Sequence, residues 1–365
     1  MIDVVVWLWS ITMHENKILS VQTIKLADVD SNNAFNFIRL VCCLIVIYEH
    51  IIVLTGIPFI NLNLRGSAVN IFFILSGFWV TKSYVKSTSL KDFFIKRCKK
   101  IMPLYYGVIF LMAIGFCFLS VLSFSEYFTD LKLYKYLFAN TIFLNFLVPA
   151  LPGVFNGSPV NGSLWTLKLE VGFYICLPFI MYICAKLNLK KRNVFLGLIY
   201  FCSYLYFIVV SYLAHKKYLP QQFVHQLPAY MMYFVVGIFY MLNWTLLQKH
   251  KIKIFVLSLV TLLVSAVSSI YLSIYLSILI PLGITGVIMF LAVSLRFCNS
   301  IASKTDYSYS MYLFHYPIIM IMNSIGYFQN KPLVAVLSVF ACTFTLAFMV
   351  HATRVFVTSL LRGDK

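Results

Sequence analysis

Charged residues are scarce in this chain of 365 residues: Asp, Glu, Lys and Arg make up 11%, while hydrophobic residues make up 61%. A soluble domain carries about 25% charged and about 45–50% apolar residues. The composition therefore excludes an ordinary soluble enzyme, a disordered chain and a disulfide-rich secreted module. Because the apolar residues fall in blocks of about 20, the sequence is typical of an all-α polytopic membrane protein.

Acidic residues are fewest of all, 11 against 29 Lys and Arg, which gives a net charge of +18. In a soluble protein this excess would suggest nucleic acid, but in a membrane protein it indicates loops held on the cytoplasmic face. We therefore expect a lipid bilayer and no nucleic acid among the partners. The nine cysteines show no CxxC or Cys/His spacing of a metal site, so we expect no metal and interpret them as small apolar fillers.

Apolar blocks divide the chain into about ten expected transmembrane helices. Residues 1–33 are expected to form a cytoplasmic or interfacial segment, 34–356 the membrane domain, and 357–365 a short cytoplasmic tail. Residues 134–150 are a shorter, interrupted block, which we interpret as re-entrant or interfacial. The ten expected spans are 34–55, 67–85, 102–123, 163–185, 193–214, 223–243, 254–271, 274–295, 307–327 and 333–355.

The segments that join these spans are alternately rich and poor in basic residues. With the N-terminus placed in the cytoplasm, the inner segments carry 20 Lys and Arg, the outer segments 6, and the spans the remaining 3. The positive-inside rule favours this orientation, which places both termini in the cytoplasm. The largest outer segment is 124–162. It is interpreted either as a cover over a site on the external face or as a plain linker, and Trp165 at its end is expected to line such a site.

Ionisable side chains within the spans are informative because one at the bilayer centre costs about 2.5–3.5 kcal/mol. Arg39 and His50 are eleven residues apart in the first span, close to three helical turns, so they share one face about 16 Å apart along the axis. Arg suits phosphate or carboxylate recognition at the cytoplasmic end. His can act as a base near neutral pH. We therefore expect Arg39 to bind the donor and His50 to be catalytic.

Three more polar positions lie in later spans. Glu170 is interpreted either as a catalytic residue that orients His50 or as a carboxylate that only neutralises Lys168. His315 lies just before a proline, and we interpret it as a site-lining residue or as one side of an interhelical hydrogen bond. Tyr309 belongs to a Tyr/Ser stripe that could satisfy a polar bundle interior.

Two further features precede the third span. Ser76 and Gly77 form a small pair that lets another helix backbone approach closely. The segment that follows is basic and amphipathic, and it is interpreted either as an anchor to anionic lipid or as a dock for a phosphate-rich cytoplasmic donor. In the second interpretation, Arg97 and Lys100 bind the donor.

Five short motifs follow one another over residues 34–355. They are Arg39 with His50, Phe72–Phe78 as FFILSGF, Pro103–Tyr105 as PLY, Ser163–Glu170 as SLWTLKLE, and Ser308–Pro317 as SYSMYLFHYP. In this order and spacing the chain resembles membrane-bound acyltransferase family 3 of the glycan O-acetyltransferase type. Two positions depart from the family pattern: Asn70 stands where an acidic residue is usual, and the last span carries His351 and Arg354 without a glutamate.

The resemblance implies an O-acetyltransferase that moves an acetyl group from cytoplasmic acetyl-CoA to an extracytoplasmic glycan or lipid-linked oligosaccharide. Such a glycan would be an O-antigen, a capsule or an exopolysaccharide, and the protein would lie in the bacterial inner membrane without a permanently bound cofactor. His50 would deprotonate the acceptor hydroxyl or carry the acetyl group transiently. A transporter or flippase, or a glycan polymerase acting on lipid-linked sugars, is the alternative from residue patterns alone.

Overall fold

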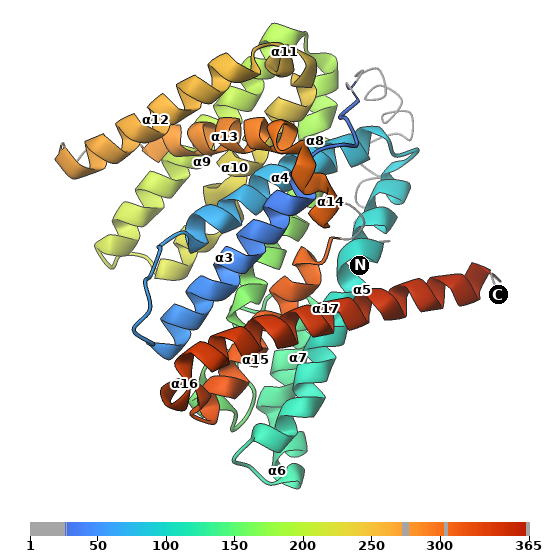
Figure 1. The fold of residues 1–365 in the computed structure, drawn as a ribbon, viewed down its shortest axis with the longest axis vertical. Coiled ribbons are helices and arrows are strands. Elements are labelled where there is room, and N and C mark those ends of the chain that lie inside the picture. Colours follow the sequence, from blue (N-terminus) through green and yellow to red (C-terminus); the bar gives the residue numbers. More distant parts are fainter. Residues whose placement is uncertain (1–25, 27, 272–276, 303–305, 363–365) are drawn as a thin grey trace. The chain divides into compact units, whose positions relative to one another are not determined.

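Helices make up the structure, a computed structural model that describes residues 26, 28–271, 277–302 and 306–362; no strand occurs among these residues (Figure 1). The longer helices are α3 (Phe35–Thr55), α4 (Arg65–Val85), α5 (Leu90–Gly115), α7 (Leu131–Thr141), α8 (Trp165–Lys186), α9 (Leu189–His215), α10 (Leu227–Leu242), α12 (Lys251–Tyr271), α13 (Ile280–Ser294), α15 (Ser308–Ser324) and α17 (Pro332–Arg362). Short helices join them: α6 (Phe124–Thr129), α11 (Trp244–Lys249), α14 (Asn299–Ala302) and α16 (Tyr327–Asn330).

Nine helical segments in the described ranges are long and apolar enough to cross a membrane. Each of them coincides with an expected span, so the prediction of an all-α polytopic membrane protein is confirmed. The expected span 307–327 corresponds to α15, whose 17 residues fall short of the about 20 that usually cross a bilayer. Residues 1–25 and 272–276 lie outside the described residues, and the orientation with both termini in the cytoplasm stays a prediction.

The basic segment before the third span is continuous with that span. Helix α5 has 26 residues and passes through Pro103, so Arg97 and Lys100 lie in the same helix as the apolar stretch that follows. Proline removes one backbone hydrogen bond, and membrane helices tolerate this loss because neighbouring groups satisfy the freed carbonyl. The basic segment and the expected third span are therefore parts of one helix.

The chain divides into two compact units. Unit 1 comprises Met1–Phe35, Val69–Lys100 and Leu169–Asn299, and unit 2 comprises Asn36–Ala68, Ile101–Lys168 and Ser300–Lys365. In unit 1, α9 packs against α10 and α12 against α13 (Figure 1). In unit 2, α15 packs against α17.

Glycine allows the closest helix approach in unit 1. A Cβ atom on Gly77 of α4 would lie 2.0 Å from the backbone oxygen of Phe234 in α10. On the other side of the crossing, a Cβ on Gly237 would lie 2.1 Å from the backbone oxygen of Ile74. The Phe234 ring also stacks on Phe173 of α8, with centroids 4.4 Å apart. The predicted role of Gly77 in close helix packing is thus seen in the structure, and its partner glycine on α10 had not been predicted.

Helices α3 and α15 of unit 2 run in the same direction, side by side. Polar contacts between them occur in the same order along both chain segments. They join Arg39 with Asp306, Cys43 with Ser308, His50 with His315, and Leu54 with Asn323. A single register therefore holds the two helices together over most of the length of α3. The segment 134–150 begins inside the eleven-residue α7 and continues as irregular backbone, and α7 is too short a helix to span a bilayer.

Candidate active site

His50 and His315 form a hydrogen-bonded pair between α3 and α15. His315 Nε2 lies 3.0 Å from His50 Nδ1, and the ring centroids are 5.0 Å apart. His315 is completely buried, whereas His50 is only half-buried. The prediction that His315 makes an interhelical hydrogen bond is confirmed. Its partner is the histidine that we had taken as catalytic, and of the two rings only that of His50 is partly exposed.

The end of the large outer segment packs on α15 around this pair. Asn161 Nδ2 donates to the carbonyl of Leu313 at 2.9 Å, and Ser163 Oγ donates to that of Tyr312 at 3.3 Å. Gly162 lies so close to Tyr316 that an added Cβ would be 2.7 Å from the tyrosine oxygen. The Tyr316 ring in turn packs edge-on against His50, with centroids 5.5 Å apart. Residues 161–163, where the outer segment meets the expected fourth span, therefore contact the turn of α15 that precedes His315.

Arg39 forms an ion pair at the other end of the α3–α15 contact. Its Nη1 atom lies 3.2 Å from Asp306 Oδ2, and the two side chains are 16% and 26% exposed. Asp306 Oδ1 also accepts from the backbone N–H and the hydroxyl of Ser308, at the start of α15. Sequence reasoning missed Asp306, although an acidic residue just before a span that has no other carboxylate was a usable signal. Arg39 thus joins two helices, and the other N–H groups of its guanidinium are not used by this ion pair.

Replacing Asp306 by asparagine is expected to destabilise the protein. Asparagine keeps an acceptor for Ser308 but removes the charge that Arg39 pairs with. Because this pair is neither fully buried nor fully exposed, we expect the free energy of unfolding to fall by about 1–3 kcal/mol. Equilibrium unfolding in detergent micelles measures it. Asp28→Asn is the matched control, because Asp28 and its partner Lys86 are 91% and 61% exposed and 3.7 Å apart. Equal stability of the two variants would contradict a structural role for the Arg39 pair.

Glu170 and Arg97 meet at one tyrosine in unit 1. The Tyr174 hydroxyl donates a short hydrogen bond to Glu170 Oε1. The Arg97 guanidinium lies 5.9 Å from the centroid of the same ring, and its Nη2 atom donates to Ser83 Oγ at 3.0 Å. Arg97 Nε is buried without a hydrogen-bond partner in the described part of the chain. Arg97 therefore keeps a donor for an anion, while the expected role of Glu170 toward His50 stays a prediction.

The remaining predicted site residues occupy varied surroundings. Lys100 is exposed on α5, Ser76 is buried on α4, and Trp165 is half-buried at the start of α8. The Tyr309 hydroxyl donates to the carbonyl of Ile101 at 2.9 Å, which ties α15 to α5 within unit 2. The described residues contain no group of three His, Cys, Asp or Glu side chains that could hold a metal ion.

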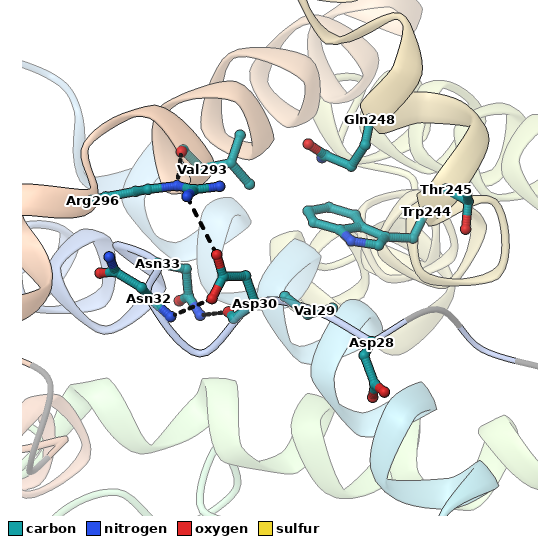
Figure 2. A pocket seen from close by; sticks show the side chains of 10 residues that line it. All are labelled: Asp28, Val29, Asp30, Asn32, Asn33, Trp244, Thr245, Gln248, Val293 and Arg296. Carbon is teal, nitrogen blue, oxygen red and sulfur yellow. Dashed lines mark hydrogen bonds and ion pairs between the residues drawn. The ribbon is translucent and has the colours of Figure 1, made fainter.

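A cavity of about 300 Å³ lies in unit 1, and none of the residues that line it is one that the sequence had suggested for the site. Figure 2 shows Arg296 paired with Asp30, with the Trp244 ring facing them across the space. Its lining residues are Asp28, Val29, Asp30, Asn32, Asn33, Trp244, Thr245, Gln248, Val293 and Arg296.

Comparisons with known proteins show which family this chain belongs to. The sequence pattern of acyltransferase family 3, described as an acyltransferase domain, matches residues 32–352. An O-acetyl transferase of Shigella phage Sf6 is 26% identical over 328 residues, which is 85% of this chain and 92% of the phage protein. Nodulation protein 10 of Rhizobium leguminosarum bv. viciae is 29% identical over 166 residues, which is 42% of this chain and 45% of that relative. No solved structure matches the chain. The chain belongs to acyltransferase family 3 and is a multi-pass membrane acyltransferase.

Proposed function

We propose that this acyltransferase moves an acetyl group from cytoplasmic acetyl-CoA to a hydroxyl of an extracytoplasmic glycan or lipid-linked oligosaccharide in the bacterial inner membrane. The acetyl group is supported by the phage relative, whose name is O-acetyl transferase. The membrane location is supported by the nine span-length helices in the described residues. The acceptor would be a surface polysaccharide such as an O-antigen, a capsule or an exopolysaccharide.

The hydrogen-bonded pair of His50 and His315 is the observation that carries the proposal. An imidazole ionises near neutral pH, so it can take a proton from a sugar hydroxyl and return it to a leaving thiolate. It can also attack the thioester itself and carry the acetyl group as a covalent intermediate. His50 is half-buried and anchored through one ring nitrogen, which leaves the other nitrogen for either chemistry. Glu170 is the second proposed catalytic residue, supporting the histidine or the sugar.

The basic part of α5 is the proposed donor-binding surface. Acetyl-CoA carries several phosphate charges, and Arg97 and Lys100 lie at the end of α5 that the positive-inside rule places in the cytoplasm. The unpaired Nε atom of Arg97 offers a donor for phosphate. Arg39 lies toward the same predicted face, about 16 Å along α3 from His50. A phosphate there would bind the N–H groups of Arg39 that the ion pair with Asp306 does not use.

This function is tested by deleting the gene and measuring the masses of the host's surface glycans by mass spectrometry. We expect each acetylated repeat unit to lose the mass of one acetyl ester, and a plasmid copy of the gene to restore it. In inside-out membrane vesicles that contain the protein, label from added acetyl-CoA should be transferred to the glycan. Unchanged glycan masses in the deletion strain would contradict a glycan acceptor.

Replacing Arg97 by glutamine is expected to raise the KM for acetyl-CoA about tenfold. Glutamine can keep the bond to Ser83 but loses the positive charge, and one charge-assisted hydrogen bond is worth about 1.5–3 kcal/mol. The KM is measured in membrane vesicles with labelled donor. Lys132→Gln is the control, because Lys132 lies in the predicted outer segment and is exposed. Equal KM values for both variants and the unaltered protein would contradict donor binding by Arg97.

A further inference from the structure

The surroundings of the two histidines differ in a way that favours one placement of their protons. His315 uses Nε2 for its contact with His50, and its Nδ1 atom is buried without a hydrogen-bond partner among the described residues. Met311 and Tyr312 lie four and three residues before His315 in α15, and a helical side chain leans toward the turn that precedes it. The backbone carbonyls of that turn can only accept hydrogen bonds, so they favour a proton on Nδ1 over a lone pair.

A neutral imidazole has one protonated and one unprotonated nitrogen, so a proton on Nδ1 leaves Nε2 of His315 as an acceptor. The nitrogen of His50 that faces it, Nδ1, must then donate. From this chain of hydrogen bonds we propose that His315 is a positioning residue, which holds His50 in the tautomer with the proton on Nδ1 and the lone pair on Nε2.

This inference rests on the proposed function of His50 and deepens it, because both chemical routes need a lone pair on Nε2. In the base route, Nε2 takes the proton of the acceptor hydroxyl while its oxygen bonds to the thioester carbon. The carbon–sulfur bond then breaks, and the thiolate takes the proton back from Nε2. In the covalent route, Nε2 bonds to the carbonyl carbon as the thiolate leaves. The acceptor oxygen then displaces Nε2 from the acetyl group, and the hydroxyl proton ends on the CoA sulfur.

The pair is also held in place mechanically. Helices α3 and α15 are joined on the far side by Arg39 and Asp306, and beyond the pair Asn323 Nδ2 donates to the Leu54 carbonyl at 3.4 Å. The end of the outer segment binds the carbonyls of Leu313 and Tyr312, next to His315. The charged groups near His50 on its outer side are Glu49, which is buried and accepts from the backbone N–H of Leu64, and Arg65. Neither replaces His315 as the partner of Nδ1.

Two substitutions at His315 separate this role from plain packing. Leucine has no acceptor for His50 Nδ1, so His315→Leu should lower kcat about tenfold or more, while the KM for acetyl-CoA changes less than about twofold. Glutamine offers an amide oxygen at a similar reach, so His315→Gln should restore most of the lost kcat. Thermal unfolding in detergent checks that both variants are folded. A kcat in His315→Leu equal to that of the unaltered protein would overturn the proposal, and so would a folded His315→Gln as inactive as the leucine variant.

Nitrogen-15 NMR reads the tautomer without any assay of activity. The full chain, labelled at histidine and reconstituted in lipid, should show His50 protonated at Nδ1, with the signal assigned by its loss in His50→Asn. In His315→Leu the signal should move toward the Nε2-protonated form, which isolated histidine side chains favour. His50 protonated at Nε2 in the unaltered protein would overturn the inference. An active His50→Asn variant would instead contradict the proposed function, so the two failures are distinguishable.

Discussion

Replacing His50 by alanine or by asparagine is expected to abolish acyl transfer, with a fall in kcat of about 10²–10⁴-fold or more. Neither replacement offers an imidazole nitrogen that can take up a proton or attack the thioester. The two variants differ in what they do to His315: alanine leaves its Nε2 buried without a partner, whereas an asparagine amide can still donate to it. We therefore expect the asparagine variant to be inactive and as stable as the unaltered protein. Transfer of label from acetyl-CoA to glycan measures kcat, and thermal unfolding in detergent measures stability.

A histidine outside the site supplies the control for this experiment. His250 is exposed between α11 and α12, and His250→Ala should keep full activity. Full glycan acetylation by His50→Asn would show that His50 takes no chemical part. Loss of activity together with loss of folded protein in both His50 variants would instead reveal a structural role, which is why the asparagine variant decides between the two.

The positions of nine of the ten expected spans could be predicted because hydropathy is local. A bilayer demands about 20 apolar residues per helix, and this demand marks segments such as 34–55 and 193–214 without knowledge of their neighbours. The proline at position 103 does not interrupt α5, because the carbonyl that a proline frees inside a membrane helix finds other partners.

The pairing of site residues could not be predicted, because hydropathy does not say which helices are neighbours. The first and ninth expected spans are 265 residues apart at His50 and His315, and nothing in the periodicity of either span names the other. The shared face of Arg39 and His50 was predictable from helical spacing. That this face meets α15 through both residues, with Asp306 as the second partner, emerged only from the structure. The sequence thus indicated candidate groups for the site and left their hydrogen-bond partners open.

Replacing Gly77 by alanine is expected to prevent stable folding, although it adds a single methyl group. The added carbon would lie 2.0 Å from the backbone oxygen and 2.9 Å from the backbone carbon of Phe234. Backbone atoms cannot rotate away as a side chain can, so α10 would have to retreat from α4. That retreat would separate Phe234 from its stacking partner Phe173 and Gly237 from Ile74. Overpacking usually lowers the free energy of unfolding by about 1–3 kcal/mol. Because this clash involves backbone atoms, we expect the loss in this variant to reach or exceed the upper end of that range.

Two substitutions elsewhere show whether the clash is responsible. Gly107 lies in α5 with no atom within 4 Å of an added Cβ, so Gly107→Ala should be neutral or slightly stabilising, since alanine is the better helix former. Ser76 is next to Gly77, and its buried hydroxyl has no hydrogen-bond partner in the described chain, so Ser76→Ala should not reduce stability. The yield of monodisperse protein in detergent and its unfolding temperature measure all three variants. If Gly77→Ala matched Gly107→Ala in both quantities, α4 and α10 would not cross as closely as the structure places them, because a crossing at this distance has no room for the methyl group.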